Sequence, residues 1–572
     1  MANASNNRFK RGRAKSAALF LFWGHFMKFT SAAIATCLAA TPALADLAAE
    51  QVLADQLNLL TFGGHADAST TATIPGPSGL KVEGYVIRID DGDEDPVEIH
   101  LGGVQLHEPG DGTVHIIYPN AFPITVRTAD PDADLEEMTV TVLFDGMSHT
   151  VSGDPDDIRH AISFRRMEFD DLTMVPDTDL PENLDTEFSL TDTAAIIQLS
   201  DRSPLRRDGS LDIGNLILRM ALTDPPTEGE FSDLTELDAQ IELSNLRSQF
   251  GYAETTIPEY TLDLSFDHFL WKQLMSGGDL DRMDLAMAAQ NFALAFDVAM
   301  SFEDLEDDFI GALASGQRLT AQTSYDSMSM DMAVDAPDGA FRSVSEAGQT
   351  TADLAFDRTG FKMAMESYDN SAVIDIPADP FIPFSNLSYQ IAYNMLDFDL
   401  PLQPGDAPQP FKLKFALSGV EMAEDIWSLF DPTGLLPRDP AELNLDIEGT
   451  TVIETDPFEQ TNNDVPFRNT KAQLKDLRIS LAGTELTATG DAEDFSTGDE
   501  FAGNATLNAR LTGVNTLLDT LVGMGLLPED QAMGARMMIG MVARQTEGED
   551  TLTSTIEVNQ DGSVIANGQR IR

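Results

Sequence analysis

Apolar and polar residues alternate along most of this chain, and a period of two is that of a β-strand. Successive side chains of a strand point to opposite faces. Each alternating segment therefore predicts a strand with one apolar face and one solvent-exposed polar face, as in antiparallel sheets. The pair Asp561-Gly562, between two such segments, predicts a closing hairpin. The clearest stripes lie at 260–266, 292–302, 328–334, 361–365, 396–400 and 411–417.

Helical spacing interrupts this pattern in a few places. Val52, Leu53, Leu57 and Leu60 recur at the spacing of one helix face, so residues 47–60 predict an N-terminal helix. The expected fold class is α+β and β-dominated. It has extended antiparallel sheets with one apolar face, an N-terminal helix and a C-terminal helical pair. We expect an N-terminal β-rich region at 46–345 and a C-terminal β-rich region at 346–572, with helices near 422–430, 514–524 and 528–544.

The segment before Asp46 has the order of a secretory signal peptide. Met27 opens a short cationic start, an apolar run follows, and small residues end it at Ala45. We expect residues 1–45 to be a signal peptide cleaved between Ala45 and Asp46, and the mature protein to be periplasmic. Translation from Met1 would give an unusually long basic start. A start at Met27 is favoured because the signal that follows it is complete by itself.

Cys37 is the only cysteine, and it lies inside this leader. Thr36 precedes it, whereas a lipoprotein cleavage site normally has a smaller residue there, so lipidation is disfavoured. A mature chain without cysteine has no thiol catalysis, no thiolate metal ligands and no disulfides.

The chain carries 95 acidic and 35 basic residues, a formal net charge of −60 at pH 7. Every charged residue before Asp46 is basic, so the mature part is more acidic still. Nucleic-acid binding is excluded because phosphate neutralisation needs clustered cations, and docking on anionic lipid through a basic patch is disfavoured for the same reason. A cation reservoir or a basic partner would fit this charge. A solvated acidic surface is favoured, since net charge acts first on solubility.

After the leader, no apolar run approaches the ~20 residues that a transmembrane helix needs. We therefore expect no transmembrane segment in the mature chain.

Three histidines are the first candidates for metal chemistry. His107 and His115 flank a turn and come close in a hairpin, and His100 lies in the same region. With Glu98 or Glu108 they would make a zinc site. Polar residues on a solvated face are the favoured interpretation, since a one-residue shift in register moves a side chain to the other face.

Alternating aspartates at 91–95 and 130–134 resemble the start of a calcium loop. Neither completes one, because Gly is missing at the sixth position and Glu at the twelfth. The chain also lacks a nucleophile elbow, a P-loop, a dinucleotide fingerprint and a His-Glu-x-x-His motif. The sequence therefore predicts no cofactor, no metal and no catalytic residue.

Methionine and phenylalanine dominate several of the apolar stripes. Methionine adapts to varied apolar shapes, which suits a lipid or a hydrophobic segment of a partner. An ordinary core is the favoured alternative, because a strand with one apolar face must bury it. The residues that would make an apolar ligand or partner face are Phe292, Phe296, Met300, Met328, Met330, Met332, Trp427, Met533, Met537 and Met541.

Three C-terminal segments resemble a known family. They are 425–440, which contains Gly434-Leu435-Leu436-Pro437, then 525–538, which opens with Gly525-Leu526-Leu527-Pro528, and the terminal segment 552–570. They resemble the exported alphaproteobacterial family catalogued as domain of unknown function 2125. The likeness is strongest after Glu421 and looser from 150 to 340. It implies an envelope protein without an assigned activity, and it supplies no catalytic residues.

Two classes of function fit these observations. The first is a non-enzymatic envelope protein whose sheets bind a lipid or a client or partner protein. The second is a cysteine-free hydrolase of envelope polymers that uses carboxylates or histidines, for which the abundance of such residues is the motivation. A purely structural envelope protein is a third interpretation, and the oligomeric state is left open.

Overall fold

The computed structural model describes residues 47–572 except 62–65, 90–96, 129–136, 176–183, 223–233, 278–279, 302–308, 338, 378–384, 459–466, 498–500, 547 and 549. It divides into two compact units. Unit 1 ends at Met283 and unit 2 begins at Asp284, except that the segment Ile257–Tyr260 belongs to unit 2. The boundary expected at residues 345 and 346 lies inside unit 2, within strand β17 (Gly339–Ala347).

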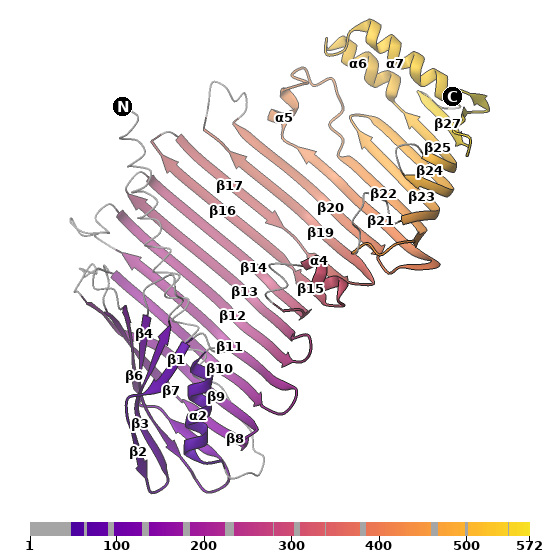
Figure 1. Cartoon of the computed structure of the whole chain (residues 1–572). Helices are drawn as coiled ribbons and strands as arrows, with labels where there is room; N and C mark the ends of the chain where they lie inside the picture. The colour runs from indigo at the N-terminus through magenta and orange to yellow at the C-terminus, as the bar shows by residue number, and fades with distance from the viewer. Residues whose placement is uncertain are drawn as a thin grey trace, which may run out of the picture. The chain divides into compact units, whose positions relative to one another are not determined.

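Unit 1 contains one described helix, α2 (Ala49–Leu60), and a series of antiparallel strands (Figure 1). The strands are β1 (Ala66–Thr70), β2 (Thr73–Gly76), β3 (Gly79–Ile89), β4 (Val97–His107), β5 (Val114–Ile117), β6 (Ala121–Thr128), β7 (Glu137–Asp145), β8 (Ser148–Asp154), β9 (Asp157–Val175), β10 (Leu184–Ser200), β11 (Leu205–Leu222), β12 (Leu234–Glu254) and β13 (Glu259–Gly277).

Helix α2 forms because its apolar residues fall on one face, and that face packs into the core of unit 1. Val52 and Leu60 are buried together with Val82 and Ile87, which lie on the inner face of β3. A fully buried aliphatic side chain contributes about 1.5–3 kcal/mol. The core is therefore closed on both sides, by the helix and by the strands that surround it.

Unit 2 is also β-dominated, with short helices between its strands. The helices are α4 (Phe309–Ala314), α5 (Glu424–Ser428), α6 (Val514–Gly523) and α7 (Glu529–Val542). The strands are β14 (Leu280–Ala299), β15 (Arg318–Tyr325), β16 (Ser327–Ala336), β17 (Gly339–Ala347), β18 (Thr350–Asp357), β19 (Gly360–Asp375), β20 (Asn386–Pro401), β21 (Gly405–Met422), β22 (Ala441–Ile453), β23 (Phe467–Leu481), β24 (Thr484–Thr497), β25 (Phe501–Thr512), β26 (Arg544–Gln545), β27 (Thr551–Val558), β28 (Val564–Ala566) and β29 (Gln569–Arg570).

The strands of unit 2 follow a simple order. From β18 to β25 each strand pairs antiparallel with the next one along the chain, and β25 pairs with β27. The hairpin β16–β17 joins this sheet through β19, and β15 pairs with β14 and β18. The β-dominated, antiparallel architecture predicted from the alternation is confirmed.

Residues with left-handed backbone interrupt several long strands. Asp192 and Asn245 have positive φ in unit 1, and Asn291, Asp369 and Gly419 have it in unit 2. Asn, Asp and Gly tolerate this conformation best. Four of these residues drop out of the pairing, and the apolar positions of the strand switch between odd and even numbers across them; they are Asp192, Asn245, Asp369 and Gly419. One face of the sheet therefore stays apolar through the interruption.

Across the described residues, none of the helices has the length and apolar character that a membrane span requires.

Candidate functional site

The most extensive chemical feature of unit 2 is a ladder of apolar side chains that crosses the sheet at right angles to the strands. Directly paired residues of antiparallel strands lie on the same face. The face that carries this ladder is called the apolar face below. Its members, in order across the sheet, are Phe296, Ala321, Leu354, Met363, Phe398, Leu413, Ile447, Leu474, Gly490, Leu507 and Ile556.

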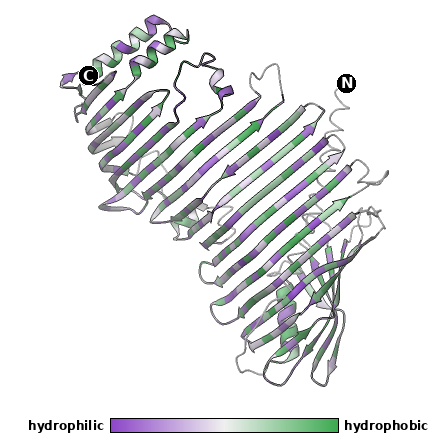
Figure 2. Ribbon diagram, turned by 180° about the vertical axis from the view of Figure 1, so that it is seen from behind, coloured by the Kyte–Doolittle hydropathy of each residue, from purple (hydrophilic) through white to green (hydrophobic). Residues whose placement is uncertain are grey.

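A second ladder runs beside the first, two residues away on every strand over most of its length. It is also mostly apolar, and it consists of Leu294, Thr323, Ala352, Met365, Leu396, Phe415, Leu445, Leu477, Ala488, Ala509 and Ser554. Figure 2 shows the result as hydrophobic and hydrophilic bands that alternate along the strands.

The apolar face is not covered by a second layer of the described residues. Leu354, Met363, Phe398 and Leu413 are all partly exposed, and none of them is buried. The buried apolar cluster of unit 2 is small. It lies beside α4 and packs against Phe296, at one end of the first ladder, and does not include the other ladder residues. A face of this kind leaves apolar surface in contact with water, which in a folded protein marks a binding surface.

The opposite face of the same strands is charged. Lys362 contacts Asp399 at 3.1 Å, and Lys412 contacts Asp397 at 2.7 Å. Lys414 extends this pattern to the next strand, with Asp446 at 3.1 Å. Hydrogen bonds to that carboxylate raise the pKa of Lys414. These partly exposed pairs keep this face in water and add little stability each.

The sheet brings together five of the residues proposed for a ligand face. Phe292 and Phe296 are four residues apart on β14, so their side chains lie on the same face of the strand. Phe296 is the first member of the first ladder. Strand β16 carries Met328, Met330 and Met332. It pairs with β17, and β17 pairs with the part of β19 that follows Asp369, so the three methionines lie on the same face as Ala372 and Ile374.

The other proposed residues lie elsewhere. Met300 is buried beside α4, and Trp427 is buried on α5. Met533, Met537 and Met541 are exposed on α7 and do not belong to the ladders. Ala45, Asp46 and the aspartates at 91–95 and 130–134 lie outside the described residues.

The loop that follows α5 is held by a buried carboxylate. Asp431 has no exposed side-chain surface, accepts hydrogen bonds from the backbone N–H groups of Leu435 and Leu436, and contacts Arg438 at 2.6 Å. Burial alone would raise the pKa of Asp431, but these hydrogen bonds outweigh it and hold the pKa well below its usual range. The guanidinium of Arg438 also lies 4.5 Å from the ring centre of Trp427, which fixes the loop in one geometry.

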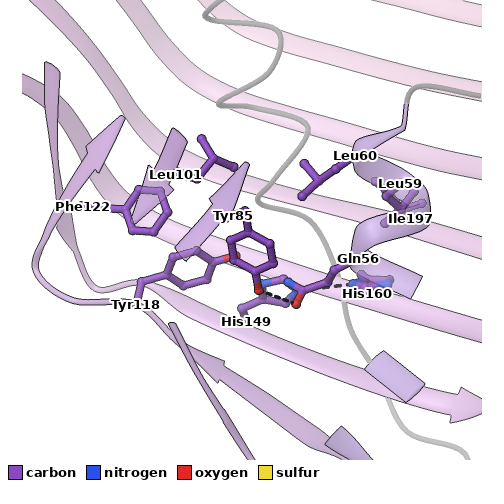
Figure 3. A pocket seen from close by; sticks show the side chains of 10 residues that line it. All are labelled: Gln56, Leu59, Leu60, Tyr85, Leu101, Tyr118, Phe122, His149, His160 and Ile197. Atoms are coloured by element: carbon purple, nitrogen blue, oxygen red, sulfur yellow. Dashed lines mark hydrogen bonds between the residues drawn. The ribbon is translucent and has the colours of Figure 1, made fainter. Parts of the chain in front are cut away.

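Unit 1 contains a different site, a chain of polar side chains that links α2 to the sheet. Figure 3 shows three of its members, Tyr118, His149 and His160. His160 on β9 contacts Asp55 of α2 at 2.5 Å through Nε2, and its Nδ1 lies 3.4 Å from Nε2 of His149 on β8. The Nδ1 of His149 lies 3.1 Å from the hydroxyl of Tyr118. This is called the polar chain below.

One assignment of protons satisfies the whole polar chain with neutral imidazoles and an ionised carboxylate. Asp55 can only accept, so Nε2 of His160 donates to it and Nδ1 of His160 accepts. Nε2 of His149 then donates to that atom, and the hydroxyl of Tyr118 donates to Nδ1 of His149. Hydrogen bonds are therefore donated in one direction along the polar chain, from Tyr118 through His149 and His160 to Asp55.

The cavity beside the polar chain is small. Gln56, Tyr85, Leu101 and Phe122 contribute to its lining, and its volume is about 20 Å³. The hydroxyl of Tyr85 donates to Gln56 at 2.9 Å, and burial raises the pKa of this tyrosine far above its usual value. A cavity of this size accommodates about one water molecule. The arrangement suits the fixing of α2 to the sheet better than the binding of an organic substrate.

The polar chain makes the stability of unit 1 depend on pH. Burial lowers the pKa of His149 well below 6.5, and electrostatic repulsion from the neighbouring His160 lowers it further. Below about pH 6.5 the unfolded chain binds a proton that the folded unit does not bind. The free energy of unfolding of unit 1 should therefore be highest above that pH. It should fall by up to about 1.4 kcal/mol per unit as pH drops toward the folded-state pKa.

Denaturation of unit 1 between pH 7.5 and 5.5, followed by hydrogen exchange, measures this slope. His149→Gln should flatten it. His107→Gln should leave it unchanged, because the Nδ1 of this histidine contacts the hydroxyl of Ser78 at 3.3 Å at an exposed place. An unchanged slope in the His149 variant would contradict the assignment.

The polar chain was not among the sequence predictions. The sequence feature that could have indicated it is a histidine at a position where the alternation predicts a buried apolar residue. His149 alternates with Val151, and His160 lies between Ile158 and Ile162. Burial of these positions was predictable from alternation, whereas their partner on α2 was not.

The histidines that were singled out are arranged differently. His107 and His115 are directly paired across β4 and β5, as the turn between them predicts. However, Glu108 accepts a hydrogen bond from the first backbone N–H of α2 at 2.6 Å, and Glu98 contacts His100 at 3.4 Å. Over the part of the chain that the structure describes, no three side chains of His, Cys, Asp or Glu are grouped to hold a metal ion.

Comparison with known protein families shows a similarity in the C-terminal part of the chain. The family described as "Uncharacterized protein conserved in bacteria (DUF2125)" matches residues 383–571. The resemblance noted in the C-terminal segments is confirmed over these residues. They include β20 to β29 and the helices α5, α6 and α7. No curated protein and no solved structure matches the chain.

Proposed function

We propose that this chain is an exported envelope protein whose unit 2 binds the acyl chains of lipids along the apolar face. The observation that carries the proposal is the pair of apolar ladders, which face water without a covering layer of described residues. The leader that ends at Ala45 supports export, and with it a periplasmic location where lipids are available.

The dimensions of the ladders suit a long apolar ligand. The first ladder makes ten steps between strands, and at about 4.8 Å per step it runs for roughly 48 Å along the sheet. Paired with the second ladder, it forms a continuous and mostly apolar strip across the sheet.

The chemistry of the strip favours an acyl chain over a polypeptide. A bound peptide brings backbone N–H and C=O groups, which lose free energy when buried without partners. The first ladder offers only hydrocarbon, thioether and aromatic groups, because the backbone groups of these strands are already paired with one another. An acyl chain needs no hydrogen bonds and adapts to the flexible methionines.

A pair of matched double variants tests this proposal. Met363 and Phe398 are directly paired on the apolar face, and one residue along on the same strands Lys362 and Asp399 are paired on the charged face. Threonine is compatible with a strand in all four places. Met363→Thr with Phe398→Thr should weaken binding of a fluorescent fatty acid at least tenfold, whereas Lys362→Thr with Asp399→Thr should change it less than twofold.

Lipid that co-purifies with the exported chain, extracted with solvent and identified by mass spectrometry, should decrease in the same variant. Equal affinity and equal lipid content in the two double variants would contradict binding at the apolar face. Circular dichroism of each variant confirms that the sheet is retained.

A further inference from the structure

A third ladder runs beside the second one on the apolar face, again two residues away on each strand. Its members from β21 onward are all leucine or isoleucine, whereas those on β18, β19 and β20 are polar. In order across the sheet they are Tyr325, Thr350, Ser367, Asn394, Leu417, Leu443, Ile479, Leu486, Leu511 and Leu552. A row of aliphatic side chains therefore ends at a group of polar ones.

The polar end of this ladder is held together by hydrogen bonds. The hydroxyl of Ser367 donates to Oδ1 of Asn370 at 3.0 Å and lies 2.7 Å from the hydroxyl of Thr350. Ser367 is also paired directly with Asn394 on the neighbouring strand. The left-handed residue Asp369 returns Asn370 to the apolar face. Thr350, Ser367, Asn370 and Asn394 are called the asparagine cluster below.

Two atoms of the asparagine cluster are buried without a hydrogen-bond partner. Over the described part of the chain, Nδ2 of Asn370 and Oδ1 of Asn394 meet neither water nor a complementary polar atom. Such atoms lose free energy and are rare in native proteins, so each calls for an explanation. Because Ser367 already occupies Oδ1 of Asn370, the cluster offers one donor and one acceptor that are both free.

We propose that the asparagine cluster binds the uncharged polar end of an acyl ligand, the free hydroxyl groups of an acylglycerol, while the acyl chain lies along the aliphatic part of the third ladder. This inference rests on the proposed function and specifies the ligand of the same face. A hydroxyl group accepts from Nδ2 of Asn370 and donates to Oδ1 of Asn394, which satisfies both atoms. Neighbouring side chains cover the two atoms, so the ligand has to displace them to reach the amides.

The length of the aliphatic part suits one acyl chain. Its six members are joined by five steps between strands, so at about 4.8 Å per step it runs for roughly 24 Å. The hydrocarbon core of a bilayer is about 30 Å thick, so one acyl chain spans about 15 Å of it. None of the six members is buried, and Ile479 is 40% exposed. An acyl chain therefore fits along this row with its polar end at the asparagine cluster.

Charge favours an uncharged polar end over a carboxylate or a phosphate. An ionised group of either kind would accept from Asn370, but it has no proton to donate to Asn394. No member of the three ladders is a lysine or an arginine, and an anion that is buried without a cation loses free energy. The net charge of −60 adds to this repulsion.

Displacement of a fluorescent fatty acid from the whole exported chain tests the proposal by comparing a monoacylglycerol with the methyl ester of the same fatty acid. The monoacylglycerol should compete about tenfold better, because its hydroxyl groups supply both partners and the ester has no donor. Asn370→Leu with Asn394→Leu, which keeps nearly the same shape, should abolish this preference and change the affinity for the ester less than twofold. Asn504→Leu with Asn508→Leu, at exposed positions of β25 on the charged face, should leave the preference unchanged.

Equal competition by the two ligands in the unmodified chain would overturn the proposal, and would mean that the two amides bond only to each other. So would a preference that survives Asn370→Leu with Asn394→Leu. Because the preference is a ratio of two affinities, it does not depend on how much of a variant folds. In both cases the fluorescent fatty acid still binds and still depends on Met363 and Phe398, so the proposed function stands. If no acyl ligand binds, the two proposals fail together.

Discussion

Replacement of Asp55 with alanine should lower the free energy of unfolding of unit 1 by about 3 kcal/mol. The carboxylate is 13% exposed, and the imidazole that it contacts is 3% exposed, so water does not readily replace it. Without it, the Nε2–H group of His160 stays buried without an acceptor, and α2 loses a polar attachment to β9. Hydrogen exchange against denaturant, read from peptides of α2 and β9, measures the change.

Two variants separate the hydrogen bond from the general effect of losing a charge. Asp55→Asn retains a side-chain oxygen that accepts from His160, so it should cost about 1 kcal/mol, near the value of one hydrogen bond. Asp67→Ala, at an exposed position of β1, should cost less than about 0.5 kcal/mol. If Asp55→Ala costs no more than Asp67→Ala, the polar chain does not fix α2 to the sheet.

The sequence predicted the strands because alternation is a local property. Phe361, Met363 and Met365 stand at alternate positions, and β19 contains all three. The same strand continues with Ala372 and Ile374 at even numbers on the apolar face, with the more exposed Val373 between them. Alternation alone would place Ala372 and Ile374 on the opposite face. The left-handed backbone at Asp369 brings these even-numbered residues back to the apolar face. Nothing in the sequence distinguishes this aspartate from the many others in the chain.

Contacts between distant elements were less predictable than pairing across a turn. His107 and His115 were expected to come close because the Pro109-Gly110-Asp111-Gly112 turn sets the register of a short hairpin, and they are directly paired. Asp55 and His160 are 105 residues apart and belong to a helix and a strand. Periodicity identifies which face of each element is buried, but it contains no information about which two faces meet.

Leucine-to-alanine variants in the two units should differ in cost, because one unit has a closed core and the other an open face. Leu190 of β10 is 1% exposed and packs between Met167 and Leu216 on the adjoining strands. Its loss should cost about 3–4 kcal/mol, since the removed atoms leave a cavity. Leu396 of β20 is partly exposed between Met365 and Phe415, and its loss should cost about 1 kcal/mol in the lipid-free protein.

The same two variants, measured with and without fatty acid, also show whether a ligand covers the apolar face. A bound ligand stabilises the folded state in proportion to its occupancy, so saturating fatty acid should raise the stability of unit 2 and leave unit 1 unchanged. Leu396→Ala should then lose more stability with lipid than without it, because the truncated side chain also weakens binding, whereas the cost of Leu190→Ala stays constant. Hydrogen exchange resolves the two units in one experiment. Equal costs for Leu190→Ala and Leu396→Ala in lipid-free protein would mean that the apolar face is already covered, and the ladders would then be a core rather than a binding surface.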